Sequence, residues 1–286
     1  MKIAVCLYGQ LRTAEYCAPW IKESFNFSAY DRETMIWGKQ NHWHTQKYEK
    51  YEQPFQVDYF CDFKTSSFTP NDVGDKKNLH TSKDIDKIRS LYNPVAEHIT
   101  PDAIDVMLTN NRPFSGRMFS SMCRTVLLKQ QYELQNNFMY DAVYLHRYDV
   151  LTGPSPTTLR DLFHQYGVQP LCIYGGHTSN VRFVNEGFRA GFMDLLLGGD
   201  SFSIDSLCAR LYQNWAVCDI EQLKHEFSFG PNTALSIAVS DAGLAFQPLQ
   251  IGTAIVRKTA DLSIPVFDSY AYHETFWVGN AVWNQK

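Results

Sequence analysis

The fold is decided by the stretch Tyr140-Asp141-Ala142-Val143-Tyr144-Leu145-His146-Arg147-Tyr148-Asp149-Val150-Leu151. Its first half is rich in β-branched and aromatic residues, which predicts a strand, and Gly153 and Pro154 follow soon after it. A cation and a carboxylate, Arg147 and Asp149, end the strand two residues apart, a spacing at which strand side chains point the same way. Ligands of open α/β sheets bind beyond the carboxyl ends of strands, so we expect both side chains to face a polar ligand.

The pair formed by Arg147 and Asp149 has two interpretations. In one, the carboxylate holds a divalent cation and the guanidinium binds phosphate oxygens, so that the pair recognises a metal-bound phosphate. In the other, the two side chains pair with each other at a sheet edge, a contact that contributes little when it is exposed. The spacing alone leaves both interpretations open.

A second candidate for ligand binding lies near the amino terminus. Residues 3–8 form a nearly continuous apolar run, which predicts a central strand buried on both faces of a parallel sheet. A turn with Gly9 follows, and Thr13 is placed to cap a helix over 14–27. Such a succession can bind an anion, to which Arg12 adds charge. Alternatively Gly9 only permits a tight turn and Arg12 is solvated, because one glycine is far less specific than a GxGxxG motif.

Composition predicts a soluble globular protein of 286 residues, most simply one large α/β domain. Hydrophobic residues make up 44% and charged residues 20%, which argues against extensive disorder. The net charge of -4 gives no basic surface, so we expect no nucleic-acid partner, and a small anionic ligand would need local Arg, Lys or metal. The aromatic fraction of 14% favours a sugar or base pocket slightly, although most aromatic residues are core residues.

The cysteines and the hydropathy pattern indicate a cytoplasmic protein. The 7 Cys include no CxxC pair, so neither a disulfide framework nor a zinc site is predicted, and reduced thiols fit best. The apolar opening is too short for a signal peptide, and no apolar run approaches the roughly 20 residues of a transmembrane helix.

The remaining pattern predicts alternating strands and helices. Strands are expected at 55–63, 99–108, 171–174, 192–197 and, once or twice, within 244–256. Helices are expected at 82–91 with Ser82 as its cap, at 117–135, 157–166 and 232–242, and after a short strand within 202–215. An irregular segment at 30–54, a polar loop at 65–79, a sharp turn at 198–201 and an aromatic tail at 261–286 complete the chain.

Two further groups were candidates for chemistry. Asp200 is a carboxylate on the glycine-supported turn, and Asp205 is its nearest competitor. His42 and His44 could share a metal, but no third ligand is in view, so a metal site there is not expected.

The order of these motifs resembles that of small bacterial and viral glycosyltransferases of the GT-A type. The matching segments are Ile3 to Thr13, Met118 to Glu133, Tyr140 to Val143 with Arg147 to Asp149, Gly199 to Phe202, Gly230 to Gly243, and Ile255 to Arg257. The resemblance implies a GT-A-like, Rossmann-related α/β fold with a central mixed sheet flanked by helices. It also implies a single domain over 1–286, in which 1–155 binds the nucleotide sugar and 156–286 binds the acceptor.

The resemblance implies a hexosyltransferase-like enzyme of polysaccharide biosynthesis, with a nucleotide sugar as donor and a glycan or lipid-linked saccharide as acceptor. In such an enzyme Asp149 would hold the Mn or Mg ion that bridges the donor diphosphate. Gly9, Arg12 and Arg147 would lie near the phosphates or ribose, and Asp200 would approach the acceptor as a catalytic base. Metal and arginines would then neutralise the departing nucleoside diphosphate, where charge develops.

The chain departs from the family pattern at two positions. The usual Asp-x-Asp is Arg147-Tyr148-Asp149, with one carboxylate, and Asn232 stands where relatives tend to have Glu. Two other classes of protein therefore stay open: a nucleotidyltransferase, although Gly9 to Arg12 is sparse for its phosphate loop, and a catalytically inactive carbohydrate-binding protein. Oligomeric state, donor, acceptor and stereochemical outcome are not predicted.

Overall fold

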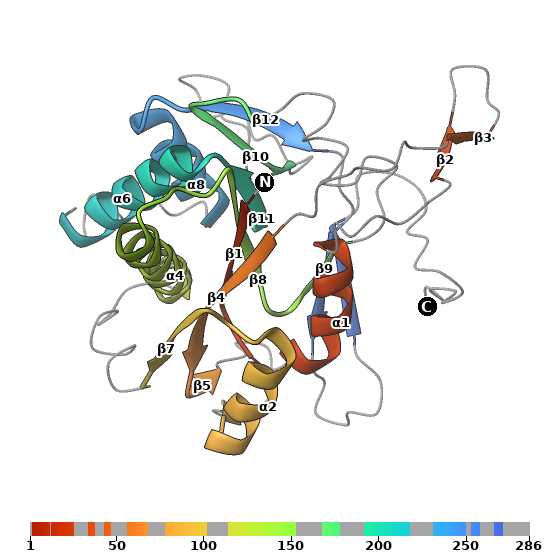
Figure 1. The fold of residues 1–286 in the computed structure, drawn as a ribbon, viewed down its shortest axis with the longest axis vertical. Helices are drawn as coiled ribbons and strands as arrows, with labels where there is room; N and C mark the ends of the chain where they lie inside the picture. Colours follow the sequence, from red (N-terminus) through yellow and green to blue (C-terminus); the bar gives the residue numbers. More distant parts are fainter. Residues whose placement is uncertain are drawn as a thin grey trace.

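The protein has an α/β fold in which helices flank both faces of a central mixed sheet (Figure 1). The structure is a computed structural model that describes residues 2–11, 13–25, 34–37, 43–46, 56–67, 78–101, 114–152, 168–177, 192–217, 231–249, 253–257 and 266–270. The expected fold class, α/β with a mixed sheet between helices, is confirmed.

Seven strands form the main sheet. In spatial order they are β12 (Ala245–Leu249), β10 (Cys172–His177), β11 (Phe192–Gly199), β8 (Ala142–Arg147), β1 (Lys2–Tyr8), β4 (Gln56–Lys64) and β7 (Ala96–Thr100). Strands β8, β1, β4 and β7 are parallel to one another, whereas β11 runs antiparallel to both of its neighbours. Because β11 is reversed, its carboxyl end lies beside the amino end of β8.

Within the described ranges, five helices cover the sheet: α1 (Ala14–Ser24), α2 (Ser82–Tyr92), α4 (Phe114–Asn136), α6 (Ser201–Val217) and α8 (Pro231–Asp241). Helices α1 and α2 pack with one core cluster, and α4, α6 and α8 pack with the other, on the opposite face (Figure 1). Strand β1 supplies both cores in alternation, with Val5 in the first and Cys6 in the second. Burial on both faces explains why its sequence is a continuous apolar run.

The path of the chain creates a switch point beside β1. From β1 the chain continues to β4 and then to β7 on one side, and α4 carries it back to β8 on the other side of β1. Crevices that bind ligands in open α/β sheets form where the strand order reverses in this way, outside the carboxyl ends of the strands. The fold therefore directs attention to the ends of β1 and β8.

Helix α4 delivers the chain into β8 and is the longest helix expected from the sequence. Its side chains Phe119, Met122 and Val126 are buried against the sheet, as the helical pattern predicts. Leu127 is 53% exposed, because it lies 100° around the helix from Val126.

The N-cap of helix α2 lies one residue earlier than the sequence indicated. Thr81, not Ser82, is the N-cap: its hydroxyl accepts from the Asp84 N–H, and the Asp84 carboxylate accepts from the Thr81 N–H at 2.7 Å. This reciprocal pair is a capping box.

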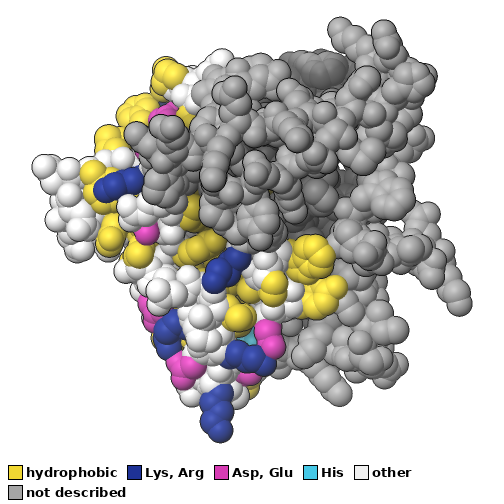
Figure 2. All heavy atoms as spheres, turned by 45° about the vertical axis from the view of Figure 1, so that its right-hand side comes forward, with side chains coloured by type: hydrophobic (Ala, Val, Ile, Leu, Met, Phe, Trp, Pro, Cys, Tyr) yellow, Lys and Arg dark blue, Asp and Glu magenta, His cyan; other side chains and the backbone are white. Residues whose placement is uncertain are grey.

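Cationic and anionic side chains are interspersed over the lower part of the described surface, where α2 lies (Figure 2).

Other boundaries differ from the sequence predictions. Strand β7 spans Ala96–Thr100 and begins three residues before the strand expected at 99–108, of which 102–108 lie outside the described residues. Segment 30–54 contains the antiparallel pair β2 (Thr34–Trp37) and β3 (Trp43–Gln46), and 65–79 contains β5 (Ser66–Ser67) and β6 (Asn78–Leu79). Gly198 and Gly199 belong to β11 instead of a turn, and α6 occupies the position of the short strand expected within 202–215.

A second, three-stranded sheet begins directly after Asp149. It contains β9 (Val150–Thr152), β13 (Thr253–Arg257) and β14 (Val266–Tyr270), with β13 between the other two. The helix expected at 157–166 and most of the aromatic tail lie outside the described residues. No described helix is long and apolar enough to cross a membrane.

Candidate functional site

The candidate site lies where β1 and β8 end side by side. Tyr8 and Arg147 are opposite each other, and the Tyr148 N–H donates to the Tyr8 carbonyl at 3.0 Å, which extends the pairing to the edge of the sheet. The chain then turns at Gly9, whose φ of +97° is a conformation that side-chain-bearing residues rarely adopt. A Cβ atom added at Gly9 would lie 3.7 Å from Cγ of Arg147. The structure therefore brings Gly9 and Arg147 together, as expected.

Arg147 and Asp149 form a two-pronged ion pair. Nε of Arg147 donates to Oδ1 of Asp149 and Nη2 donates to Oδ2, each at 2.9 Å. The Asp149 side chain is fully buried, and the Arg147 side chain is 15% exposed. Of the two interpretations of this pair, mutual pairing is the arrangement observed, although it is buried instead of exposed. The parallel hydrogen bonds fix the plane of the guanidinium.

These residues do not fit the Mn or Mg ion that the resemblance implies. Both carboxylate oxygens of Asp149 already accept hydrogen bonds from a permanent cation, and Arg147 occupies the position where a second acid would help to hold the ion. Mg and Mn bind through several oxygen ligands, chiefly carboxylates, carbonyls and waters. Within the part of the chain that the structure describes, no three His, Cys, Asp or Glu side chains gather as a metal site.

His146 contributes no charge to this edge. Its ring is fully buried, and burial lowers its pKa to about 4, so the imidazole is neutral at neutral pH. Nδ1 lies 2.7 Å from the Arg147 carbonyl and donates to it in the neutral ring, while Nε2 has no hydrogen-bond partner among the described residues. The ring packs edge-on against Phe25, on the α1 side. The guanidinium of Arg147 is therefore the cation of the described β8 terminus.

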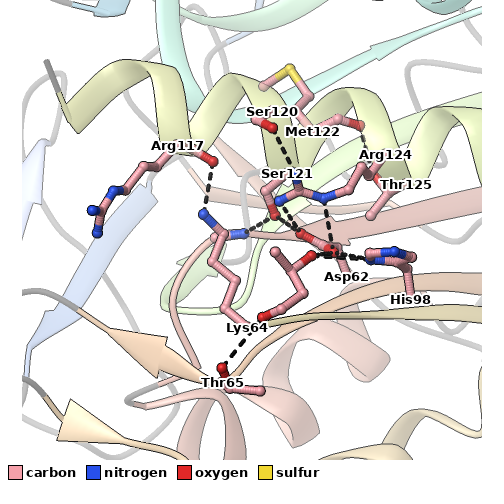
Figure 3. A network of polar contacts seen from close by, with 12 residues as sticks. Asp62, Lys64, Thr65, His98, Arg117, Ser120, Ser121, Met122, Arg124 and Thr125 are labelled. Carbon is pink, nitrogen blue, oxygen red and sulfur yellow. Dashed lines mark hydrogen bonds and ion pairs between the residues drawn. The ribbon is translucent and has the colours of Figure 1, made fainter. Parts of the chain in front are cut away.

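A buried polar network around Asp62, drawn in Figure 3, supports the Gly9 turn through Ser121. The Gly9 N–H donates to Oγ of Ser121 on α4 at 3.3 Å, and Ser121 donates in turn to Asp62 on β4. Asp62 also accepts from Arg124 at 3.0 and 3.2 Å and from the Thr100 hydroxyl at 2.6 Å. The network thus ties the turn to three neighbouring elements, β4, β7 and α4.

The Asp62 carboxylate is ionised in this network. Burial by itself would raise the pKa of Asp62, but hydrogen bonds from His98, Arg124 and Ser121 and the charge of Arg124 outweigh burial and lower it to about 2. The side chain of Asp62 is completely buried, so it supports the site without reaching a ligand. Sequence analysis did not identify this residue.

Asp200 lies at the opposite end of the strands, beside the amino end of β8. Because β11 is antiparallel to β8, Gly199 is opposite Val143 and Leu196 is opposite His146. At roughly 3.3 Å per strand residue, Asp200 is about 16 Å from Arg147. Its carboxylate accepts from the N–H and the hydroxyl of Ser203, so it caps α6. The structure therefore does not bring Asp200 together with Arg147 and Asp149, and its role as a base near the acceptor stays a prediction. Arg12 lies outside the described residues.

The competitor of Asp200, Asp205, belongs to a buried charge cluster between α4 and α6. Nζ of Lys129 is 2.7 Å from Asp205 and 2.9 Å from Glu133, and the Lys129 side chain is fully buried. Ser201 donates to Glu133 at 2.8 Å, and so does the Tyr140 N–H at 2.7 Å, at the amino end of β8. The cluster joins two helices far from the carboxyl ends of β1 and β8, which indicates a structural role.

The solved structures that are similar to this chain include two transferases. No family model and no curated protein matches the sequence. Mouse xyloside xylosyltransferase 1 is 10% identical, with 87% of this chain and 86% of that chain covered and a TM-score of 0.44. The galactosyltransferase LgtC, solved with donor and acceptor sugar analogs, is 12% identical, with 86% and 73% covered and a TM-score of 0.37. Similarity at this level does not by itself establish a shared activity.

Proposed function

We propose that the protein is a glycosyltransferase that moves a sugar from a nucleotide sugar to a glycan or lipid-linked saccharide. The observation that carries the proposal is the position of Arg147: its guanidinium stands beside the Gly9 turn, at the switch point between β1 and β8. Ligands of α/β sheets bind at such points, and a guanidinium there suits a phosphate. The order of motifs that resembles GT-A enzymes supports a sugar nucleotide as the source of that phosphate.

Arg147 would stabilise the leaving group of the transfer. When the bond between sugar and diphosphate breaks, negative charge increases on the nucleoside diphosphate, and a fixed cation at that position favours the transition state. The Arg147 guanidinium is held in its plane by Asp149, and the adjacent turn is held by Ser121. Arg12, three residues after Gly9, is proposed as a second phosphate-binding side chain.

The two halves of the chain would divide the substrates between them. Strands β1 and β8, whose ends form the candidate site, belong to 1–155, which supports the proposal that this half binds the donor. We assign the acceptor to 156–286. A role in polysaccharide biosynthesis in the cytoplasm is part of the same proposal.

A carbohydrate-binding protein without turnover is the second candidate. It is favoured by one observation, the engagement of both Asp149 oxygens by Arg147, which leaves the site without the metal-holding acid of the related enzymes. Such a protein would bind a saccharide and release no nucleotide.

The test is incubation with a panel of nucleotide sugars and saccharide acceptors, with release of nucleoside diphosphate as the readout. We expect release by the wild type, loss of it in Arg147→Ala, and retention in Arg210→Ala, whose exposed arginine on α6 contacts Gln213. Pyrophosphate release would indicate a nucleotidyltransferase instead. Saccharide binding without any nucleotide release would favour the second candidate.

A further inference from the structure

We infer that the donor diphosphate binds without a divalent cation, and that Asp149 is a positioning residue for Arg147 instead of a metal ligand. The inference rests on the proposed function for the identity of the ligand. It depends on the geometry of three described groups: the Arg147–Asp149 pair, the Gly9 turn and the Asp62 network.

The first step concerns the carboxylate oxygens. A metal ligand needs an oxygen lone pair directed at the ion, and each Asp149 oxygen is 2.9 Å from a different guanidinium nitrogen of Arg147. An ion bound to either oxygen would also lie within a few ångströms of the guanidinium, and two cations at that separation repel each other strongly in a buried site. Metal binding would therefore require the pair to break.

The second step concerns the balance of charge. Two buried carboxylates lie at or behind this edge, and each is already matched by its own arginine: Asp149 by Arg147 and Asp62 by Arg124. A divalent cation is attracted to acids whose charge is not compensated, because these offset the loss of its hydration. The described acids at this edge are compensated, so they favour an arginine-based anion site over a cation site.

The third step assigns a role to Asp149. A guanidinium recognises phosphate through its planar arrangement of N–H donors, and this works best when the plane is fixed before the ligand arrives. Asp149 fixes the plane by a buried two-pronged contact, and it comes directly before β9, whose pairing with β13 holds the backbone. Asp149 thus acts on the ligand through Arg147.

The experiment is calorimetric titration with inorganic pyrophosphate and with UDP, GDP, CDP and ADP, each with EDTA and each with MnCl2. Pyrophosphate carries the shared anionic group and makes the result independent of the base. We expect at least one of these ligands to bind with dissociation constants that agree within about twofold under the two conditions, a difference too small for a lost charge-assisted contact.

Variants separate positioning from metal binding. Asp149→Asn should weaken binding about tenfold in EDTA and in MnCl2 alike, because one charge-assisted contact that orients Arg147 is lost. Arg147→Lys, which keeps the charge but not the planar fork, should weaken binding under both conditions and serves if Asp149→Asn fails to fold. Asp86→Asn, an exposed acid on α2 that pairs with Arg89, is the matched control and should bind like the wild type.

Two outcomes would overturn the inference in different ways. Binding that needs MnCl2, and that loses only its MnCl2-dependent part in Asp149→Asn, would make Asp149 a metal ligand and leave the glycosyltransferase proposal intact. Absence of binding by every probe under both conditions would refute the anion site, and with it both the inference and the proposed function.

Discussion

Replacement of Asp62 by Asn should destabilise the fold by an amount that depends on pH. The pKa of Asp62 is lowered from its ordinary value of 3.8 to about 2. This is a shift of about two units, and at about 1.4 kcal/mol per unit it corresponds to about 2–3 kcal/mol of folding free energy. Because the folded-state pKa is depressed, this contribution is fully present above pH 3.8 and is lost as the pH falls from there towards 2.

The assay is urea unfolding of the wild type, Asp62→Asn and Asp86→Asn at several pH values from 7 down to the acid range. At neutral pH we expect Asp62→Asn to unfold with a free energy lower by about 2–3 kcal/mol, and we expect the difference to shrink below pH 4 as the wild-type carboxylate takes up a proton. Asp86→Asn should change little, because its ion pair with Arg89 is exposed. A neutral-pH stability equal to that of the wild type, or a difference that persists in acid, would refute the reasoning.

Four further substitutions test other parts of the molecule. Gly9→Ala should weaken pyrophosphate binding in calorimetry, because φ is +97° at this position and an alanine there would distort the turn. Gly243→Ala is the control, because Gly243 has a φ of +66° but precedes β12 at the opposite end of the strands. It should lower the unfolding free energy by about 1 kcal/mol and leave binding unchanged. Equal effects of the two on binding would contradict a special role for Gly9. Lys129→Met should cost about 3–5 kcal/mol in urea unfolding, because the buried Glu133 and the partly buried Asp205 would lose their cation; a stability equal to that of the wild type would show that the carboxylates become neutral at little cost. Gly198→Ala should lower the melting temperature, because the added Cβ would lie 2.7 Å from the Tyr144 ring; an unchanged melting temperature would mean that the ring moves aside freely.

Local sequence patterns were sufficient to predict the elements that form the candidate site. The apolar run 3–8 and the aromatic strand after Tyr140 became β1 and β8, because burial on both faces of a sheet requires such sequences. The end of β8 brings Arg147 and Asp149 together, as their spacing predicted, while ligand binding by these residues stays a prediction. Which of the two interpretations of the pair applied depends on side-chain conformation, which residue spacing does not specify.

The distance between Asp200 and Asp149 follows from strand direction. Both residues come after strands of the main sheet, but β11 runs antiparallel to β8, so the carboxyl ends of these two strands lie at opposite ends of the pair. Strand direction depends on how distant segments pair, and a single sequence contains little local information about it.

The Asp62 network was missed for a related reason. Its partners come from β7 and α4 and are 36 to 62 residues away along the chain. A weak signal was present, because Asp58 and Asp62 lie on the same face of an otherwise apolar strand and must therefore be buried with partners. Asp58 accepts a hydrogen bond from the Tyr140 hydroxyl at 2.7 Å and another from the Gln56 side chain at 3.0 Å.

The two outermost strands of the described main sheet bear on how the protein behaves when it is concentrated. An outer strand offers unpaired backbone groups to which a strand of another molecule can add, and such addition leads to filaments and precipitates. Both β7 and β12 are only five residues long. Glu97 on β7 is held by Arg89 at 2.7 Å, and Pro248 on β12 has no amide hydrogen to offer. Neither outer strand of the described main sheet therefore favours pairing with a strand of another molecule, which should keep molecules of this protein dispersed at high concentration.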